Sequence, residues 1–246
     1  EVLQLVSNGD FTEGVEQLTQ PIDLTVDFIG INGGVIDDAN SFTTDGTPTT
    51  EGIRNNVGTF DLVDGKSYKL VIAGTTTSSG FTIGSVTASG NEYGTGFGTH
   101  YFVATTANPT TLWIRQQTAG TTDLTTFTIE ELGADWIDQG SPLDVASYDE
   151  NGLTITSYNT SSNTNRVNQG AVVTAGKSYK VTYTIHSATL TGSNTLQYFN
   201  GVTYIDMPTA ITGTAQTFYY TTATTVTNLG WYFRVETSNA STTDFV

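Results

Sequence analysis

The chain has 246 residues, and 24 Asp and Glu against 8 Lys and Arg give it a formal net charge of −16. This excess of negative charge argues against a nucleic-acid binder, because phosphate recognition needs clustered Lys and Arg, and against binding to anionic membranes. The chain has no cysteine, so any extracellular stability must come from packing or metal rather than disulfides. No apolar run approaches the ~18 residues that a membrane span needs.

Turn signals punctuate short runs of alternating residues along the whole chain, which is the all-β pattern. Asn-Gly pairs at 8–9, 32–33, 151–152 and 200–201 are typical of tight turns, because Asn and Gly tolerate positive φ. Strands are expected, in chain order, at 67–73, 101–104, 125–132, 153–156 and 178–185. Those at 125–132 and 178–185 show the period of two that places one face in a core and the other in solvent. No window combines a 3.6-residue period with helix caps.

One pentapeptide, Gly65-Lys66-Ser67-Tyr68-Lys69, recurs about 110 residues later as Gly176-Lys177-Ser178-Tyr179-Lys180, which indicates an internal repeat. Its neighbours recur in the same order: R-x-N-x-G at 54–58 and 166–170, an aromatic-x-Arg pattern at 113–115 and 232–234, and Thr-Thr-Asp at 121–123 and 242–244. The chain is therefore expected to hold two tandem modules, 1–132 and 133–246, with the last strand of the second cut short. Gly-Lys-Ser here opens a strand and lacks the first glycine of a P-loop, so nucleotide binding is not expected.

Further segments resemble a known family. Leu5 to Gly14 (Leu-Val-Ser-Asn-Gly-Asp-Phe-Thr-Glu-Gly), the Gly-Lys-Ser-Tyr-Lys strand and an Asp-containing closing strand are similar to carbohydrate-binding modules of families 4, 9 and 22. Glu130 to Trp136 (Glu-Glu-Leu-Gly-Ala-Asp-Trp) resembles the junction between such modules in structural proteins of tailed bacteriophages. The resemblance implies two tandem jelly-roll β-sandwiches. The first copy departs from the family pattern, because no Trp follows its Asn-Gly-Asp-Phe segment.

A structural calcium is the one cofactor that the resemblance implies. In the family, the N-terminal segment and the closing Asp share the ion, so Asp10, Glu13 and Asp123 are the expected ligands in the first copy, and Asp244 in the second. Their carboxylates are the hard oxygen ligands that Ca²⁺ prefers, although no compact D-x-D-x-D-G loop is present.

Glycan binding would need exposed aromatic rings that stack on sugars. The candidates lie in loop-rich stretches: Tyr93, Phe97, Tyr101, Tyr198 and Tyr204. For each ring the alternative is a place in the core or an interface, where aromatic residues of β-sandwiches usually lie. Trp113, Trp231 and Tyr232 fall inside expected strands and are interpreted as core or inter-module packing.

Catalysis has little support in the sequence. His100 and His186 lie in different modules, and there is no H-E-x-x-H or G-x-S-x-G motif. A pair of glycosidase carboxylates is left open, because acidic residues are numerous. We expect no enzyme.

The predicted function is a virion structural or adhesive protein at the virion surface: a tail fibre, an appendage or a head decoration. Its expected partners are other virion or surface proteins, further copies of itself in a homo-oligomer, and host-surface glycans, with no nucleic acid and no membrane insertion. The alternatives are a carbohydrate-binding module pair of a secreted glycoside hydrolase, and a bacterial surface or filament protein.

Overall fold

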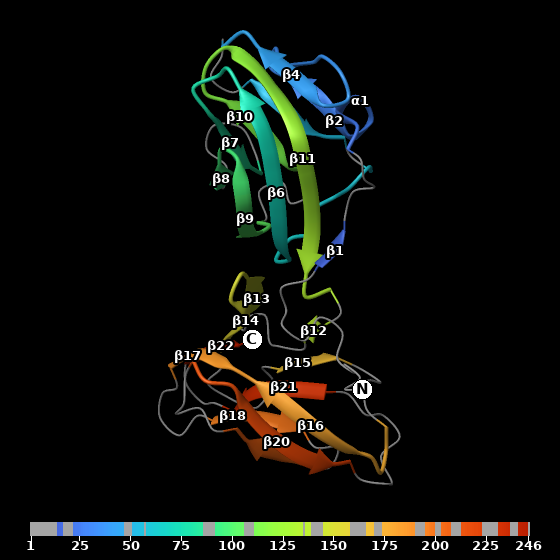
Figure 1. Cartoon of the computed structure of the whole chain (residues 1–246), viewed down its shortest axis with the longest axis vertical. Coiled ribbons are helices and arrows are strands. Elements are labelled where there is room, and N and C mark those ends of the chain that lie inside the picture. Colours follow the sequence, from blue (N-terminus) through green and yellow to red (C-terminus); the bar gives the residue numbers. More distant parts are fainter. Residues whose placement is uncertain are drawn as a thin grey trace. The chain divides into compact units, whose positions relative to one another are not determined.

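A computed structural model describes residues 14–16, 22–46, 51–56, 58–85, 92–105, 111–134, 136–138, 145–157, 166–169, 174–189, 195–199, 203–207, 213–222, 231–236 and 241–245 (Figure 1). The chain divides into two compact units, and the division falls between Leu132 and Gly133. Residues 1–13, which the sequence assigns to the first module, lie outside the described residues.

The unit Gly14–Leu132 contains two antiparallel sheets (Figure 1). The β11 sheet has the order β3 (Val35–Ile36), β4 (Ser41–Thr44), β11 (Gly120–Leu132), β6 (Ser67–Thr76) and β9 (Gly98–Val103), and β1 (Gly14–Glu16) also pairs with β11. The β10 sheet has the order β2 (Phe28–Ile31), β5 (Gly52–Asn55), β10 (Trp113–Gln116), β7 (Phe81–Gly84) and β8 (Glu92–Thr95). From β4 to β11 the chain crosses repeatedly between the two sheets, and the last strand, β11, pairs with both β4 and β1. This is a jelly roll.

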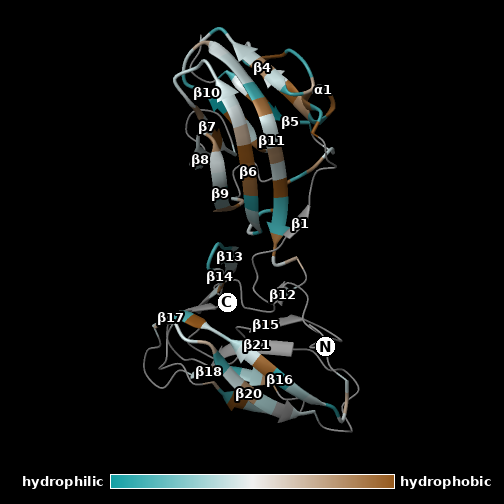
Figure 2. Cartoon of the chain, viewed as in Figure 1, coloured by the Kyte–Doolittle hydropathy of each residue, from teal (hydrophilic) through white to brown (hydrophobic). Residues whose placement is uncertain are grey.

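The core of this unit is made by side chains that alternate along the strands. On β6, Tyr68, Leu70 and Ile72 are buried, while Lys69 and Val71 are more exposed. Figure 2 shows hydrophobic bands along β6 and β11. Rings join the two sheets: Phe28 meets the edge of Phe127 with their centroids 5.4 Å apart. The two sheets are therefore the halves of one β-sandwich.

The second unit repeats this strand order with one strand divided. Its β21 sheet has the order β12 (Ile137–Asp138), β15 (Arg166–Gln169), β21 (Trp231–Glu236), β18 (Thr195–Phe199) and β19 (Tyr204–Asp206). The strands that correspond to the β11 sheet form two groups. One is a sheet with the order β13 (Val145–Asp149), β14 (Gly152–Ser157), β22 (Ser241–Phe245) and β17 (Ile185–Thr189). The other is the pair β16 (Ser178–Tyr183) and β20 (Gln216–Thr221). The strand expected at 178–185 thus divides at Thr184 into β16 and β17.

The prediction of an all-β chain of two jelly-roll β-sandwiches is confirmed. The structure adds one short helix, α1 (Leu24–Asp27), which the sequence analysis missed. Asp23 caps it by accepting from the backbone N–H of Thr25, and a single turn is too short to show helical periodicity. No helix in the described ranges is long and apolar enough to cross a membrane.

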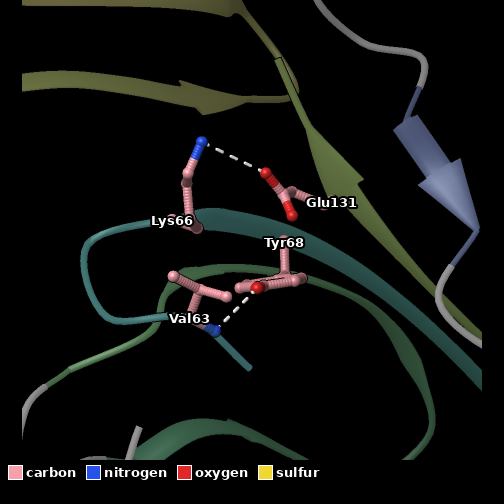
Figure 3. Close-up of polar contacts among 4 residues, drawn as sticks. All are labelled: Val63, Lys66, Tyr68 and Glu131. Carbon is pink, nitrogen blue, oxygen red and sulfur yellow. Dashed lines mark hydrogen bonds and ion pairs between the residues drawn. The ribbon is translucent and has the colours of Figure 1, made fainter. Parts of the chain in front are cut away.

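The repeated pentapeptide forms the same turn in both units, and Figure 3 shows the first copy. Gly65 and Gly176 have positive φ of 78° and 71°, which explains the glycine. The Tyr68 hydroxyl accepts from the backbone N–H of Val63 at 2.9 Å, and the Tyr179 hydroxyl accepts from that of Thr174 at 2.6 Å. The tyrosine therefore ties the turn to the strand that follows it, and the pentapeptide is a structural element.

Candidate functional site

The outward face of the β10 sheet carries the candidate site. Ile114 lies in the core and Gln116 bonds to side chains of the opposite sheet, so the alternate residues of β10, Trp113 and Arg115, face away from the core. On β5 the same alternation buries Ile53 and Asn55 and turns Arg54 outward. An aromatic ring and two guanidinium groups therefore share one face of the sheet.

The strand register arranges this face in two rows. The first row runs Ile29, Arg54, Trp113, Gly84 and Glu92 across β2, β5, β10, β7 and β8. The second row, two residues further along β10, runs Ile31, Gly52, Arg115, Thr82 and Thr95. We call these ten residues the Trp113 face. Trp113 has a glycine on one side, so its ring has no side chain directly beside it on β7.

Glycine at position 52 is required by the close approach of β5 to β10. A Cβ atom built on Gly52 would lie 1.9 Å from the carbonyl oxygen of Ile114, far inside van der Waals contact. Any larger residue would push the two strands apart. Position 52 of β5, which lies opposite Arg115 and two residues from Arg54, must therefore be a residue without a side chain.

Two buried donors on this face have no partner. The Trp113 Nε1 and Arg115 Nε atoms are buried and make no hydrogen bond within the described part of the chain. Arg115 is only 9% exposed, and Arg54 and Trp113 are half-buried. Burial lowers the pKa of Arg115, while the negative charge of Glu92 works in the opposite direction. An unpaired buried donor costs about 1–3 kcal/mol.

The ion pairs of the described residues lie elsewhere. Lys66 pairs with Glu131 at 3.2 Å and Lys69 with Glu130 at 3.5 Å, and the described residues contain no other pair within 4.0 Å. No carboxylate of the described residues therefore lies within 4.0 Å of either arginine of the Trp113 face, and Glu92 acts on Arg115 from a greater distance. This is notable in a chain that has three acidic residues for each basic one.

Two of the predicted aromatic platforms are buried instead. Tyr93 belongs to the core and stacks on Phe102 at a centroid distance of 4.1 Å. A β-bulge in the β7–β8 pairing adds Tyr93 to its strand and turns it inward. Tyr198 is 7% exposed and stacks on Phe218 at 4.3 Å. Neither ring offers a free face to a sugar, so the prediction is corrected for these two.

The other three predicted rings are partly accessible but do not lie together on one sheet face. Phe97, in the turn after β8, is 36% exposed and meets the edge of Phe81 at 5.0 Å. Tyr101 is half-buried on β9, in the β11 sheet, opposite Lys69. Tyr204 is half-buried on β19 of the other unit, 5.0 Å from Phe199.

The predicted calcium ligands are only partly described. Asp10 and Glu13 lie outside the described residues. Asp123 is exposed on β11, opposite Ser41 and Thr75. Asp244 holds the matching place on β22, opposite Thr154 and Ser187. The described residues contain no group of three His, Cys, Asp or Glu that could hold a metal ion, so the calcium site stays a prediction.

The two histidines lie in separate environments. His100 contacts the carbonyl oxygen of Gly96 through Nε2 at 3.0 Å and lies against Gly94, where a Cβ atom would be 2.3 Å from its ring. His186 is exposed on β17.

Sequence reasoning missed the Trp113 face, because it interpreted Trp113 as packing. A signal was present: Trp113-Ile114-Arg115 places an aromatic and an arginine on the same side of a strand, and the second copy repeats the pattern. In that copy Arg234 lies opposite both Arg166 and Gln197, and Tyr232 opposite Asn168. The sequence alone does not show that Arg54 becomes the neighbour of Trp113.

The sequence matches no protein-family model and no curated protein. Among solved structures, the chain is similar to the N-terminal tandem of CBM22-1 and CBM22-2 from Paenibacillus barcinonensis Xyn10C. The two chains share 10% sequence identity with a TM-score of 0.32, over 95% of this chain and 98% of that one.

Proposed function

We propose that this chain is a non-enzymatic, glycan-binding adhesive protein, and that a sugar lies across the Trp113 face. The observation that carries the proposal is the position of Trp113, half-buried at the middle of an outward sheet face and beside a glycine. The apolar C–H surface of a sugar ring stacks on an indole of this kind.

Polar groups around the indole supply the rest of a sugar site. Arg54 lies directly beside Trp113, and Arg115 lies two residues further along β10. Their guanidinium groups donate hydrogen bonds to sugar oxygens, and Glu92, exposed at the sheet edge, accepts from sugar hydroxyls. A ring platform with a few donors and acceptors beside it is the usual composition of a small-ligand site.

The setting that we propose is a virion surface, where repeated modules of this kind build a tail fibre, an appendage or a head decoration. Two jelly rolls in tandem suit such a protein, because repetition adds length without a new fold. A module pair of a secreted glycoside hydrolase and a bacterial surface protein remain the alternatives. Sedimentation velocity separates these settings: a trimer or a larger array supports the fibre, and a monomer supports the module pair.

The test of glycan binding compares the full chain with two variants on a glycan array, followed by calorimetric titration of the best ligand. Trp113→Ala is expected to weaken binding about tenfold or more, the effect of losing ~1.4 kcal/mol. Tyr101→Ala, a half-buried ring on the other sheet, is the matched control and is expected to bind normally. Thermal melting of each variant checks that it folds.

Two results would overturn the proposal. If the intact chain binds to no glycan on the array, the chain is not a glycan binder. If Trp113→Ala folds and binds as well as the intact chain, the site lies elsewhere.

A further inference from the structure

We propose that the Trp113 face selects anionic glycans, in which a carboxylate or sulfate on the sugar is held by Arg54 and Arg115. This inference rests on the proposed glycan-binding function and specifies the ligand's chemical class.

The distribution of positive charge in the chain is the first argument. The chain has four lysines, all within the two copies of the pentapeptide: Lys66, Lys69, Lys177 and Lys180. Its four arginines all lie on the matching strand pairs β5–β10 and β15–β21: Arg54, Arg115, Arg166 and Arg234. Arginine positions are thus confined to the equivalent sheet of each module.

The arginines of the first module form no ion pair within 4.0 Å with any described residue. Lys66 and Lys69 have carboxylate partners at 3.2 and 3.5 Å. Arg54 and Arg115 have none within 4.0 Å among the described residues, and the Arg115 Nε atom is buried without a hydrogen-bond partner. Carboxylates are three times as numerous as cations in this chain, so a shortage of internal partners does not explain this arrangement.

The register places both guanidinium groups around one sugar-sized space. Arg54 is opposite Trp113, and Gly52 is opposite Arg115, so the four positions form a square on the sheet. The arginines occupy opposite corners, as diagonal neighbours roughly 7–8 Å apart with their Cβ atoms somewhat closer. Gly52 occupies the third corner without a side chain, and Trp113 the fourth. An acidic sugar stacked on Trp113 would direct its anionic group between the two arginines.

Charge and desolvation favour an anion over a neutral sugar. Arg115 is 9% exposed, so its charge has already lost much of its hydration. The arginine fork matches a carboxylate or sulfate with two parallel hydrogen bonds, stronger than bonds to a neutral hydroxyl. Glu92 lies on the other side of Trp113, beyond Gly84, and would repel an anion from that edge. The anionic group is therefore expected on the β5 side of the indole.

The test uses pairs of sugars that differ only in charge. Oligogalacturonate is compared with its methyl ester, and a sulfated galactan oligosaccharide with its desulfated form, which carries no charge, by calorimetric titration of the full chain. We expect at least one anionic sugar to bind about tenfold or more tightly than its neutral partner. The binding of the anionic sugar should weaken as NaCl rises from about 0.05 M to about 0.5 M. The two pairs distinguish a carboxylate from a sulfate as the recognised group.

Variants locate the effect. Arg54→Gln, at a half-buried position, is expected to fold and to lose the preference for the anionic sugar while retaining binding of the neutral one. Arg115→Gln is expected to do the same, and Arg54→Gln keeps the test valid if the more buried change prevents folding. Lys66→Gln removes the same charge away from the face and is the control, expected to keep the preference.

The outcomes separate this inference from the proposed function. Equal binding of charged and neutral sugars, or an equal loss of preference in Lys66→Gln and Arg54→Gln, overturns anionic selectivity but leaves glycan binding intact. Absence of binding to both members of both pairs, with no glycan retained on the array, overturns both.

Discussion

Ionisation of Tyr68 should make the first unit lose stability at high pH. Tyr68 is fully buried, and its hydroxyl accepts from the N–H of Val63 (Figure 3). Burial is the main cause that raises the pKa of Tyr68 from 10.0 to about 12; the Val63 hydrogen bond opposes this shift and the charge of Glu131 adds to it. Below pH 10 both the folded and the unfolded chain keep the proton. Between pH 10 and about 12 only the unfolded chain loses it, so the free energy of unfolding falls by up to ~2.7 kcal/mol.

The assay is urea unfolding of the intact chain and of Tyr68→Phe at several pH values from 9 to about 11.5. At pH 9 the variant is expected to be less stable by ~1–2 kcal/mol, because the Val63 N–H loses its acceptor. By about pH 11.5 the intact chain should have lost about 2 kcal/mol more than the variant, since only the intact chain carries Tyr68. Tyr183 and Tyr198, whose pKa values burial also raises, are present in both proteins and cancel. Equal alkaline losses in the two proteins would refute this reasoning.

Two further changes test polar contacts of the same unit. Gln116→Leu should destabilise the first unit by ~2–3 kcal/mol in urea unfolding, because two buried hydroxyls lose a hydrogen-bond partner. Thr44 donates to Gln116 Oε1 at 2.6 Å, and Thr122 accepts from Gln116 Nε2 at 2.7 Å. A loss of stability under ~0.5 kcal/mol would contradict this expectation. Lys66→Met should cost no more than ~1 kcal/mol, because Lys66 is 48% exposed and water and salt screen its pair with Glu131. A loss above ~1.5 kcal/mol in 0.15 M salt, which gives a Debye length of ~8 Å, would show that the pair is not a surface contact.

The sequence predicts most of the fold, because the signals for strands and turns are local. Alternation along residues 125–132 follows the buried Phe127 and Ile129 of β11, and the repeated Gly-Lys-Ser-Tyr-Lys marks the same turn in both units. The division of the strand at Thr184 was not predicted, because alternation continues through the break in the hydrogen-bond ladder.

The site was harder to predict, because neighbours on a sheet face come from distant parts of the chain. Arg54 and Trp113 are adjacent only through the β5–β10 register. The second copy shows the difficulty: Tyr232, which corresponds to Trp113, lies opposite Asn168 and not opposite Arg166. The shared R-x-N pattern is therefore shifted by two residues between the copies, and sequence alignment alone mispairs it. Tyr93 was misplaced for a similar reason, since a bulge in its pairing with β7 turned the ring inward.

The most direct measurement is a calorimetric titration of the intact chain and of Trp113→Ala with the glycan that binds best on the array. We expect a saturable isotherm for the intact chain and binding at least about tenfold weaker for the folded variant. The same affinity in both proteins would contradict the claim that the Trp113 face is the binding site.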